Sequence, residues 1–216
     1  MLAPDHYSET RGRLEALGAS IGYFSMDRSG ISPFADLRSF ASIFNIIRDC
    51  RPDVVLTYFA KPNIFGISAS FCARVPWRLA MVGGMGYVFT QGSCGRRTLK
   101  QIVVGWLVLY LYRITFMAAS RVVALNPDDL RDLQASCGLK LNKAVLLGGI
   151  GVCMSEWRMH LPHENPITFT MVGRLLKEKG VFEFLNAVRI IKLKFLYVRF
   201  LLFMGRGSKS WLILFA

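Results

Sequence analysis

The sequence predicts an α/β protein: a Rossmann-like, doubly wound parallel sheet, followed by the start of a second α/β domain. Short apolar segments rich in β-branched residues alternate with helix-period segments from Ser20 to Leu147. The strand segments are continuously apolar, which is typical of strands buried in a parallel sheet. In addition, 53% of the 216 residues are hydrophobic, so the chain can bury a core of domain size.

The expected elements of the first domain follow one another in the order strand, turn, helix. We expect strands at residues 20–26, 53–57, 78–82, 121–125 and 144–147. We expect helices from Asp36 to just before Pro52, over 64–74, over 99–118, and from Pro127 onward. Asp36 stands where a helix cap would, and Asn126 with Pro127 is a stronger start signal of the same kind.

The second domain is expected to begin after a linker. Residues 148–166 lose periodicity and are rich in glycine and proline, which favours a connection between domains. The predicted division is therefore 1–147, a linker over 148–166, and 167–216. Within residues 167–216 we expect a strand over 167–172, a helix from Val181 and a strand over 197–204. One such βαβ unit cannot bury both faces of its sheet, so we expect this domain to be incomplete.

The turn between the strand at 167–172 and the next helix is the main candidate site. It carries three cations, Arg174, Lys177 and Lys179, between Gly173 and Gly180. Ligands of open α/β sheets bind at the carboxyl ends of the strands. Cations beside a helix N-terminus suit a phosphate or diphosphate group. The alternative is a solvated basic turn without a ligand.

Charge and cysteine content narrow the classes of partner. The chain has 27 basic and 14 acidic residues, a net charge of +13, which favours polyanionic partners. The cations are scattered rather than clustered in an arm, so an anionic membrane surface and phosphate ligands are favoured over nucleic acid. The five cysteines are widely spaced and no Cys/His set has metal-ligand spacing, so we predict reduced thiols and no metal site.

The expected helix at 99–118 has three possible interpretations. Its uninterrupted apolar run is shorter than the roughly 18–20 residues that span a bilayer. A membrane-spanning helix is therefore the least favoured of the three interpretations. It can be a core helix of the α/β domain. It can also lie in a membrane interface, because Trp106, Tyr110 and Tyr112 suit the headgroup region and basic residues precede them at 96, 97 and 100.

Several short motifs occur together in a characteristic order. They are RPDVV at 51–55, KPN at 61–63, GMGYVFT at 84–90, NPDD at 126–129, GIGV at 149–152 and VGRLLKEKG at 172–180. In this order and spacing they resemble the bacterial GT-B glycosyltransferases of family 4, in the branch that builds lipopolysaccharide, capsule and bacillosaminyl-lipid saccharides. The resemblance runs from about Pro4 to Gly205.

The resemblance implies a retaining transferase that needs no metal and no cofactor. Its substrates would be a nucleotide-sugar donor, usually UDP-linked, and a polyprenyl-diphosphate-linked saccharide. Arg174 and Lys179, next to Gly173, match the family's pair that holds the donor diphosphate. Such cations stabilise the negative charge that develops on the leaving diphosphate. The location implied is cytoplasmic, peripheral on the inner face of the bacterial membrane.

The acceptor would dock on the first domain of such an enzyme. The acceptor-side candidates are Lys61, Asn63, Gly83, Gly84 and Gly86, because they follow strands that end at the cleft. The structural alternative is that Asn63 belongs to a turn and helix cap and that the glycines form a tight loop.

The chain departs from the family at both ends. The family's first strand with its glycine-rich loop, and its paired-glutamate signature, would lie before Met1 and beyond Ala216. We therefore expect a chain truncated at both ends, inactive by itself, in which no catalytic base can be named. The alternative is a non-catalytic, membrane-associated remnant or binding module. A nicotinamide oxidoreductase is disfavoured because residues 84–89 and 149–154 lack the third fingerprint glycine.

Overall fold

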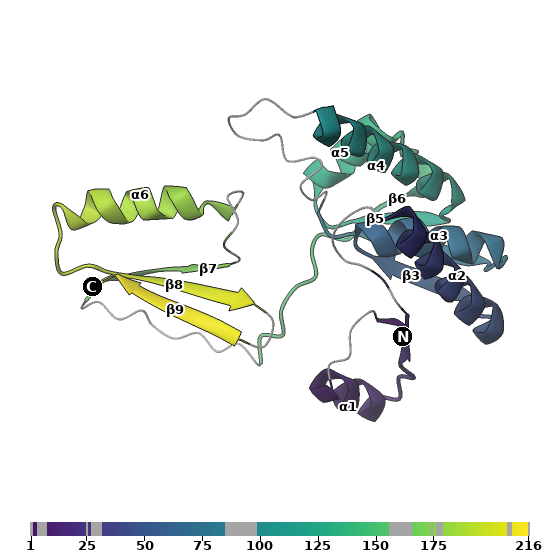
Figure 1. Cartoon of the computed structure of the whole chain (residues 1–216), viewed down its shortest axis with the longest axis horizontal. Coiled ribbons are helices and arrows are strands. Elements are labelled where there is room, and N and C mark those ends of the chain that lie inside the picture. The colour runs from purple at the N-terminus through teal and green to yellow at the C-terminus, as the bar shows by residue number, and fades with distance from the viewer. Residues whose placement is uncertain are drawn as a thin grey trace. The chain divides into compact units, whose positions relative to one another are not determined.

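The computed structural model has two compact units (Figure 1), Met1–Gly151 and Val152–Ala216. The residues that it describes are 2–3, 8–24, 26, 32–84, 99–155, 166–173, 175, 179–206 and 209–215. The two units are described in turn.

The first unit is built on a four-stranded parallel sheet. Its strands are β3 (Val54–Tyr58), β4 (Trp77–Val82), β5 (Arg121–Ala124) and β6 (Ala144–Leu146), in the order β3-β4-β5-β6. These four strands confirm the α/β prediction, with bounds within a residue or two of those expected. The strand expected at 20–26 is shorter: β2 covers only Gly22–Tyr23 and pairs with β1 (Leu2–Ala3) in a separate sheet.

The helices of the first unit follow its strands. They are α1 (Ser8–Ala16), α2 (Pro33–Cys50), α3 (Ala60–Cys72), α4 (Leu99–Ala118) and α5 (Pro127–Cys137), with a 3₁₀ turn at Leu141–Lys143. The bounds of α4 are those predicted. The start of α5 is also confirmed, because the side-chain oxygen of Asn126 accepts a hydrogen bond of 2.7 Å from the backbone N–H of Asp129.

Two helix starts were predicted too late. The prediction that Asp36 caps α2 is wrong: α2 starts at Pro33 with Ser32 as its N-cap residue, because proline is pre-organised for the first helical position. Asp36 lies in the first turn. Similarly, α3 starts at Ala60 rather than at residue 64, because a proline in the first turn, Pro62, costs no helical hydrogen bond.

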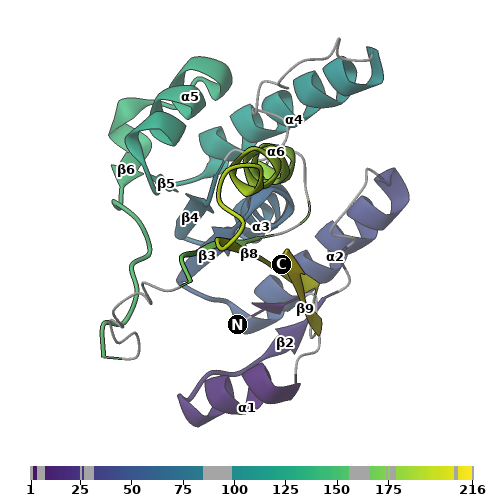
Figure 2. The ribbon, with the colours of Figure 1, turned by 90° about the vertical axis from the view of Figure 1, so that its left-hand side faces the viewer.

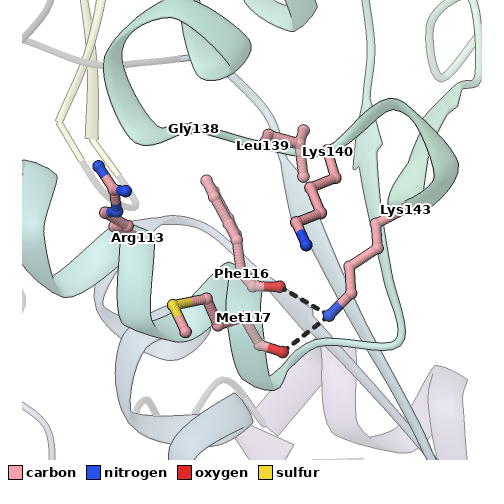
Figure 3. A pocket seen from close by; sticks show the side chains of 7 residues that line it. All are labelled: Arg113, Phe116, Met117, Gly138, Leu139, Lys140 and Lys143. Atoms are coloured by element: carbon pink, nitrogen blue, oxygen red, sulfur yellow. Dashed lines mark hydrogen bonds between the residues drawn. The ribbon is translucent and has the colours of Figure 1, made fainter.

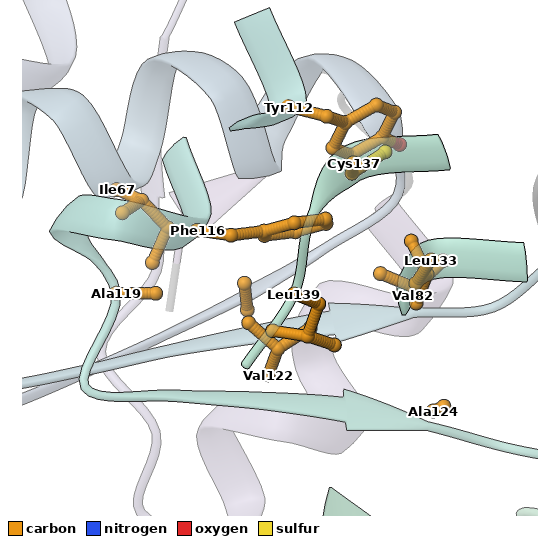
Figure 4. Close-up of a cluster of buried hydrophobic side chains, with 11 residues drawn as sticks. Ile67, Val82, Tyr112, Phe116, Ala119, Val122, Ala124, Leu133, Cys137 and Leu139 are labelled. Atoms are coloured by element: carbon orange, nitrogen blue, oxygen red, sulfur yellow. The ribbon is translucent and has the colours of Figure 1, made fainter. Parts of the chain in front are cut away.

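Three helices of the first unit cover one face of the sheet. Since the strand order rises monotonically, right-handed crossovers place α3, α4 and α5 on the same side, and α3 contacts both α2 and α4 (Figure 2). Figure 4 shows the result: Ile67 of α3, Phe116 of α4 and Leu133 of α5 pack in one buried cluster with alternate residues of β4 and β5. On the opposite face, Val54 and Leu56 of β3 are exposed.

The second unit combines a parallel pair with a hairpin. Strand β7 (Thr168–Val172) pairs in parallel with β8 (Arg199–Arg206), and β9 (Lys209–Phe215) pairs antiparallel with β8. Helix α6 (Val181–Lys192) connects β7 to β8 and packs Val188 against Phe200. Strand β9 was not predicted from the sequence, although an apolar run after two glycines, at 205 and 207, is a hairpin signal.

Candidate functional site

The turn after β3 carries the first group of acceptor-side candidates. Asn63 is fully buried. Its side-chain nitrogen donates to the carbonyl oxygen of Met81 at 2.9 Å, and its side-chain oxygen accepts from the hydroxyl of Thr57 at 2.6 Å. Asn63 therefore ties the first turn of α3 to the carboxyl ends of β3 and β4, which is where ligands of such sheets bind.

Lys61 is held by an acid from another helix. Its ammonium nitrogen lies 2.9 Å from a carboxylate oxygen of Asp36, and the two side chains are only 20% and 14% exposed. The pair joins the first turn of α3 to the first turn of α2 and balances the charge of Lys61 locally. Asp36 thus has a role 25 positions away in the chain, not the capping role expected from its place in the sequence.

Phe59 is a functional candidate that the sequence analysis did not find. It has φ 73° and ψ 166°, a backbone conformation populated almost only by glycine, and such outliers cluster at functional sites. Its carbonyl accepts from the backbone N–H of Asn63 at 2.9 Å, and its ring centroid lies 4.0 Å from that of Tyr58. The Phe59 side chain is 59% exposed. No side-chain pattern signals a backbone angle, which is why the sequence did not reveal it.

The glycines after β4 have distinct reasons to be glycine. A Cβ at Gly83 would lie 2.5 Å from the Tyr58 ring, whereas a Cβ at Gly84 would meet open space. Gly84 has φ 103°, which disfavours any side chain. Gly86 lies outside the described residues. Gly83 therefore allows the close approach of two strand ends, and contact of these glycines with an acceptor stays a prediction.

The turn between β7 and α6 is the donor-side candidate. The backbone N–H of Gly173 donates to the carbonyl of Phe203 at 3.1 Å, so the residue extends the β7–β8 ladder. Gly180, with φ 78°, is the N-cap residue of α6, and Lys179 before it is exposed. Among the described residues no carboxylate forms an ion pair with Lys179. Arg174 and Lys177 lie outside the described residues. The predicted cation is thus present beside a helix N-terminus and open to solvent.

A further basic site lies at the C-terminal end of α4. A pocket of about 190 Å³ is lined by residues of α4, of the link after α5 and of the 3₁₀ turn (Figure 3): Arg113, Phe116, Met117, Gly138, Leu139, Lys140 and Lys143. The sequence analysis did not single out this group, because its cations come from segments about 27 residues apart and form no local cluster.

Lys143 closes the end of α4. Its ammonium donates to the backbone carbonyls of Phe116 and Met117, which the last turn of the helix leaves without intrahelical partners, and to that of Ala119 just after the helix, at 3.2, 2.7 and 2.8 Å. The pKa of Lys143 is lowered, first by burial and then by the nearby cations Arg78, Lys140 and Arg121. The part of the shift that these cations cause indicates a positive local potential, which an anion would relieve.

Helix α4 itself has two faces. In the part of the chain that the structure describes, no helix combines the length and apolar character needed to cross a bilayer. Tyr112 and Phe116 are buried in the core of the first unit, whereas Trp106 and Tyr110 are 72% and 62% exposed. The core interpretation therefore holds for one face of the helix, and the other face is apolar and exposed.

The class of protein is an α/β protein of the GT-B type. The chain superposes on a putative UDP-N-acetylglucosamine 2-epimerase from Listeria monocytogenes with a TM-score of 0.54, at 14% identity, over 94% of this chain and 53% of that one. A MurG structure from Acinetobacter baumannii matches with a TM-score of 0.47 at 16% identity, over 96% of this chain and 49% of that one. At 14% identity the likeness to the epimerase structure concerns the fold alone.

The curated relatives are bacterial glycosyltransferases. An N,N'-diacetylbacillosaminyl-diphospho-undecaprenol α-1,3-N-acetylgalactosaminyltransferase of Campylobacter jejuni is 26% identical over 94% of this chain and 54% of its own length. A UDP-Gal:α-D-GlcNAc-diphosphoundecaprenol α-1,3-galactosyltransferase of Escherichia coli is 25% identical over 74% of this chain and 42% of its own length. The capsular polysaccharide biosynthesis glycosyltransferase CapM of Staphylococcus aureus is 23% identical over 74% and 43%.

The chain spans about half the length of the curated relatives it matches. No protein-family profile matches it.

Proposed function

We propose that the chain is part of a glycosyltransferase that moves a sugar from a UDP-linked donor to an undecaprenyl-diphosphate-linked saccharide in the synthesis of a cell-surface polysaccharide. The observation that carries this proposal is the match to the Campylobacter transferase over 94% of the chain. Two of the three relatives carry diphospho-undecaprenol acceptors in their names. The basic turn at the N-terminus of α6 supplies the chemistry that a nucleotide-diphosphate donor needs.

The donor is held at the β7–α6 turn in this proposal. Breaking the bond between sugar and diphosphate builds negative charge on the leaving group. The backbone N–H groups at the start of α6 and Lys179 beside them, together with Arg174 as the resemblance implies, stabilise that charge more in the transition state than in the ground state.

The acceptor side divides into two kinds of residue. Asn63 and Gly83 shape the carboxyl edge of the sheet, because Asn63 has no exposed surface and Gly83 makes room for Tyr58. Gly84 and Gly86 remain the candidates for contact with the acceptor, whereas Lys61 is already paired with Asp36 and supports the edge. We place the protein at the inner face of the cytoplasmic membrane, where a polyprenyl-linked acceptor and a cytoplasmic nucleotide sugar meet.

The stereochemistry and the cofactor requirement follow from the family resemblance. We propose retention of the anomeric configuration and turnover without metal or cofactor. Proton NMR of the product would show the α-anomer from an α-linked donor. Turnover in the presence of EDTA would equal turnover in its absence. A β-linked product, or loss of turnover on chelation that Mg²⁺ restores, would contradict these two points.

Sugar transfer tests the proposal directly. The full-length transferase that contains this chain is incubated with UDP-N-acetylgalactosamine, UDP-galactose or UDP-N-acetylglucosamine and an undecaprenyl-diphosphate saccharide, and the extended lipid is measured by mass spectrometry. The Lys179→Ala variant is expected to lower turnover about 100-fold, the scale of losing one transition-state charge contact. Lys194→Ala, at the other end of α6, is the matched control. Acceptor binding without transfer from any donor would instead support a binding module.

A further inference from the structure

We propose that the ring of Phe59, supported by the ring of Tyr58, is an aromatic platform on which a pyranose ring of the acceptor packs. The inference deepens the proposed function, on which it rests, by naming the residue that recognises the sugar of the acceptor rather than its diphosphate or its lipid chain.

The first observation is the backbone conformation of Phe59. Its φ of 73° and ψ of 166° are open to glycine and unfavourable for any residue that has a Cβ. After the neighbouring strand β4 the chain does use a glycine at a positive angle, Gly84 with φ 103°. A phenylalanine in such a conformation therefore indicates that the ring has a use that glycine could not provide.

The surrounding structure holds Phe59 in this conformation. Its carbonyl accepts from the backbone N–H of Asn63 at 2.9 Å. The side chain of Asn63 is fully buried and bonds to the Thr57 hydroxyl at 2.6 Å and to the Met81 carbonyl at 2.9 Å. The same amide thus fixes the chain on both sides of Phe59. A ring on so constrained a backbone loses little further freedom when a ligand packs on it.

The second observation is the place of the ring. Phe59 directly follows β3, at the carboxyl edge of the sheet, where ligands of such folds bind. Its side chain is 59% exposed, so it does not serve to fill the core. Its ring centroid lies 4.0 Å from that of Tyr58, and a Cβ at Gly83 would come within 2.5 Å of the Tyr58 ring. Gly83 therefore makes room for Tyr58, and Tyr58 supports Phe59.

An exposed aromatic ring suits a sugar. One face of a pyranose presents C–H groups, which fit the negatively polarised face of an aromatic ring. Contact between the two faces also removes apolar surface from water. The proposed acceptor is a saccharide linked to a diphosphate, so it contains at least one such ring.

Charge and polarity separate the sugar from the other parts of the acceptor. Lys61 is the one charged residue of α3, and Asp36 already balances it, so α3 offers a diphosphate no unpaired cation. Pro62 in the first turn lacks an N–H that could bind an anion. A polyprenyl chain needs continuous apolar surface, whereas the pair of Lys61 and Asp36 lies at the start of this helix. The sugar is the part that fits Phe59.

Acceptor kinetics of the full-length transferase that contains this chain test the proposal. Phe59→Ala should raise the acceptor KM about tenfold, the scale of one apolar contact, and leave the KM of the UDP-linked donor unchanged. Phe59→Tyr keeps the ring and should keep the wild-type acceptor KM. Phe59→Leu keeps apolar volume without a flat face and should resemble Phe59→Ala. Phe71→Ala, which changes a ring 56% exposed at the other end of α3, is the matched control.

Two probes identify the part of the acceptor that meets the ring. N-acetylglucosamine linked through a diphosphate to a decyl chain carries the sugar, and decyl diphosphate lacks it. Isothermal titration calorimetry of the same protein should show that Phe59→Ala weakens binding of the first probe about tenfold and leaves the second unchanged. Equal weakening of both probes would show that the ring packs on the lipid chain, and would overturn the assignment.

A stability measurement separates a ligand-binding role from a structural one. Phe59→Gly removes the ring and relieves the backbone angle, whereas Phe59→Ala removes the ring and keeps the angle. In the 216-residue chain the glycine variant should unfold about 2–4 °C above the alanine variant. In the full-length protein both variants should lose affinity for the sugar-bearing probe. Wild-type affinity in Phe59→Gly, or a glycine variant no more stable than the alanine variant, would overturn the proposal.

The outcomes also distinguish this proposal from the proposed function. If Phe59→Ala transfers sugar with the wild-type acceptor KM, the platform is wrong and the proposed function stands. If the sugar-bearing probe binds through Phe59 while no UDP-linked donor gives transfer, the platform stands and the proposed function is wrong.

Discussion

The turn after β3 and the turn after β7 look alike in the sequence and differ in the structure. Each follows a parallel strand, opens a helix and carries a lysine. In the first turn, Lys61 is paired with Asp36 and largely buried. In the second, Lys179 is exposed, and no described carboxylate pairs with it. The difference teaches that a cation at a strand end becomes a ligand candidate only where the fold has not already supplied its partner.

The largest expected effect comes from the buried amide of the first turn. Asn63→Ala removes the side chain that donates to the Met81 carbonyl and takes away the shorter of the two hydrogen bonds that the Thr57 hydroxyl donates, the other going to the carbonyl of Leu79. We expect the free energy of unfolding to fall by about 3 kcal/mol, since each buried group left unsatisfied costs about 1–3 kcal/mol. Urea denaturation measures the change. Asn142→Ala, at an exposed position, is the control, and a loss below 1 kcal/mol would show that the amide does not hold the turn.

The second effect concerns the close approach of the strand ends. Gly83→Ala would place a methyl group 2.5 Å from the ring of Tyr58, and we expect a loss of about 2 kcal/mol from overpacking. Gly12→Ala, inside α1 where nothing lies within 4 Å, should instead raise stability, because alanine favours helix over glycine. If both changes had the same sign, the steric role of Gly83 would be refuted.

The third prediction concerns the strength of the ion pair between Lys61 and Asp36. A double-mutant cycle of Lys61→Met and Asp36→Asn, read by urea denaturation, should give a coupling energy of about 1 kcal/mol, at the upper end for pairs near the surface because these side chains are mostly buried. A coupling of zero would mean that Lys61 is as available to ligands as Lys179, and the contrast between the two turns would be lost.

The smallest effect on stability is expected in the second turn. Lys179→Ala removes an exposed side chain, so the unfolding free energy should stay within about 0.5 kcal/mol of the wild type. Thermal unfolding measures this change without ligand. A larger loss would indicate that Lys179 serves the fold, as Lys61 does.

The sequence predicts the parts of this fold that depend on neighbouring residues. The Asn126–Pro127 start of α5 and the bounds of α4 are local signals, and both are confirmed. The Asp36–Lys61 pair and the Asn63–Met81 bond join segments 25 and 18 residues apart, which no local pattern displays. The pocket lined by Arg113 and Lys140 could not be predicted for the same reason, because these two residues lie far apart in the sequence. The donor-side role of Arg174 and Lys179 rests on resemblance and turn position, and it stays a prediction.

The affinity of the chain for UDP, compared with uridine, tests the central claim that the β7–α6 turn binds a diphosphate. Isothermal titration calorimetry of the wild type, Lys179→Ala and the Lys194→Ala control gives the comparison. We predict that Lys179→Ala lowers UDP affinity at least about tenfold, the scale of a charged hydrogen bond, while uridine affinity and the control stay unchanged. Equal UDP affinity in the wild type and Lys179→Ala would contradict the claim.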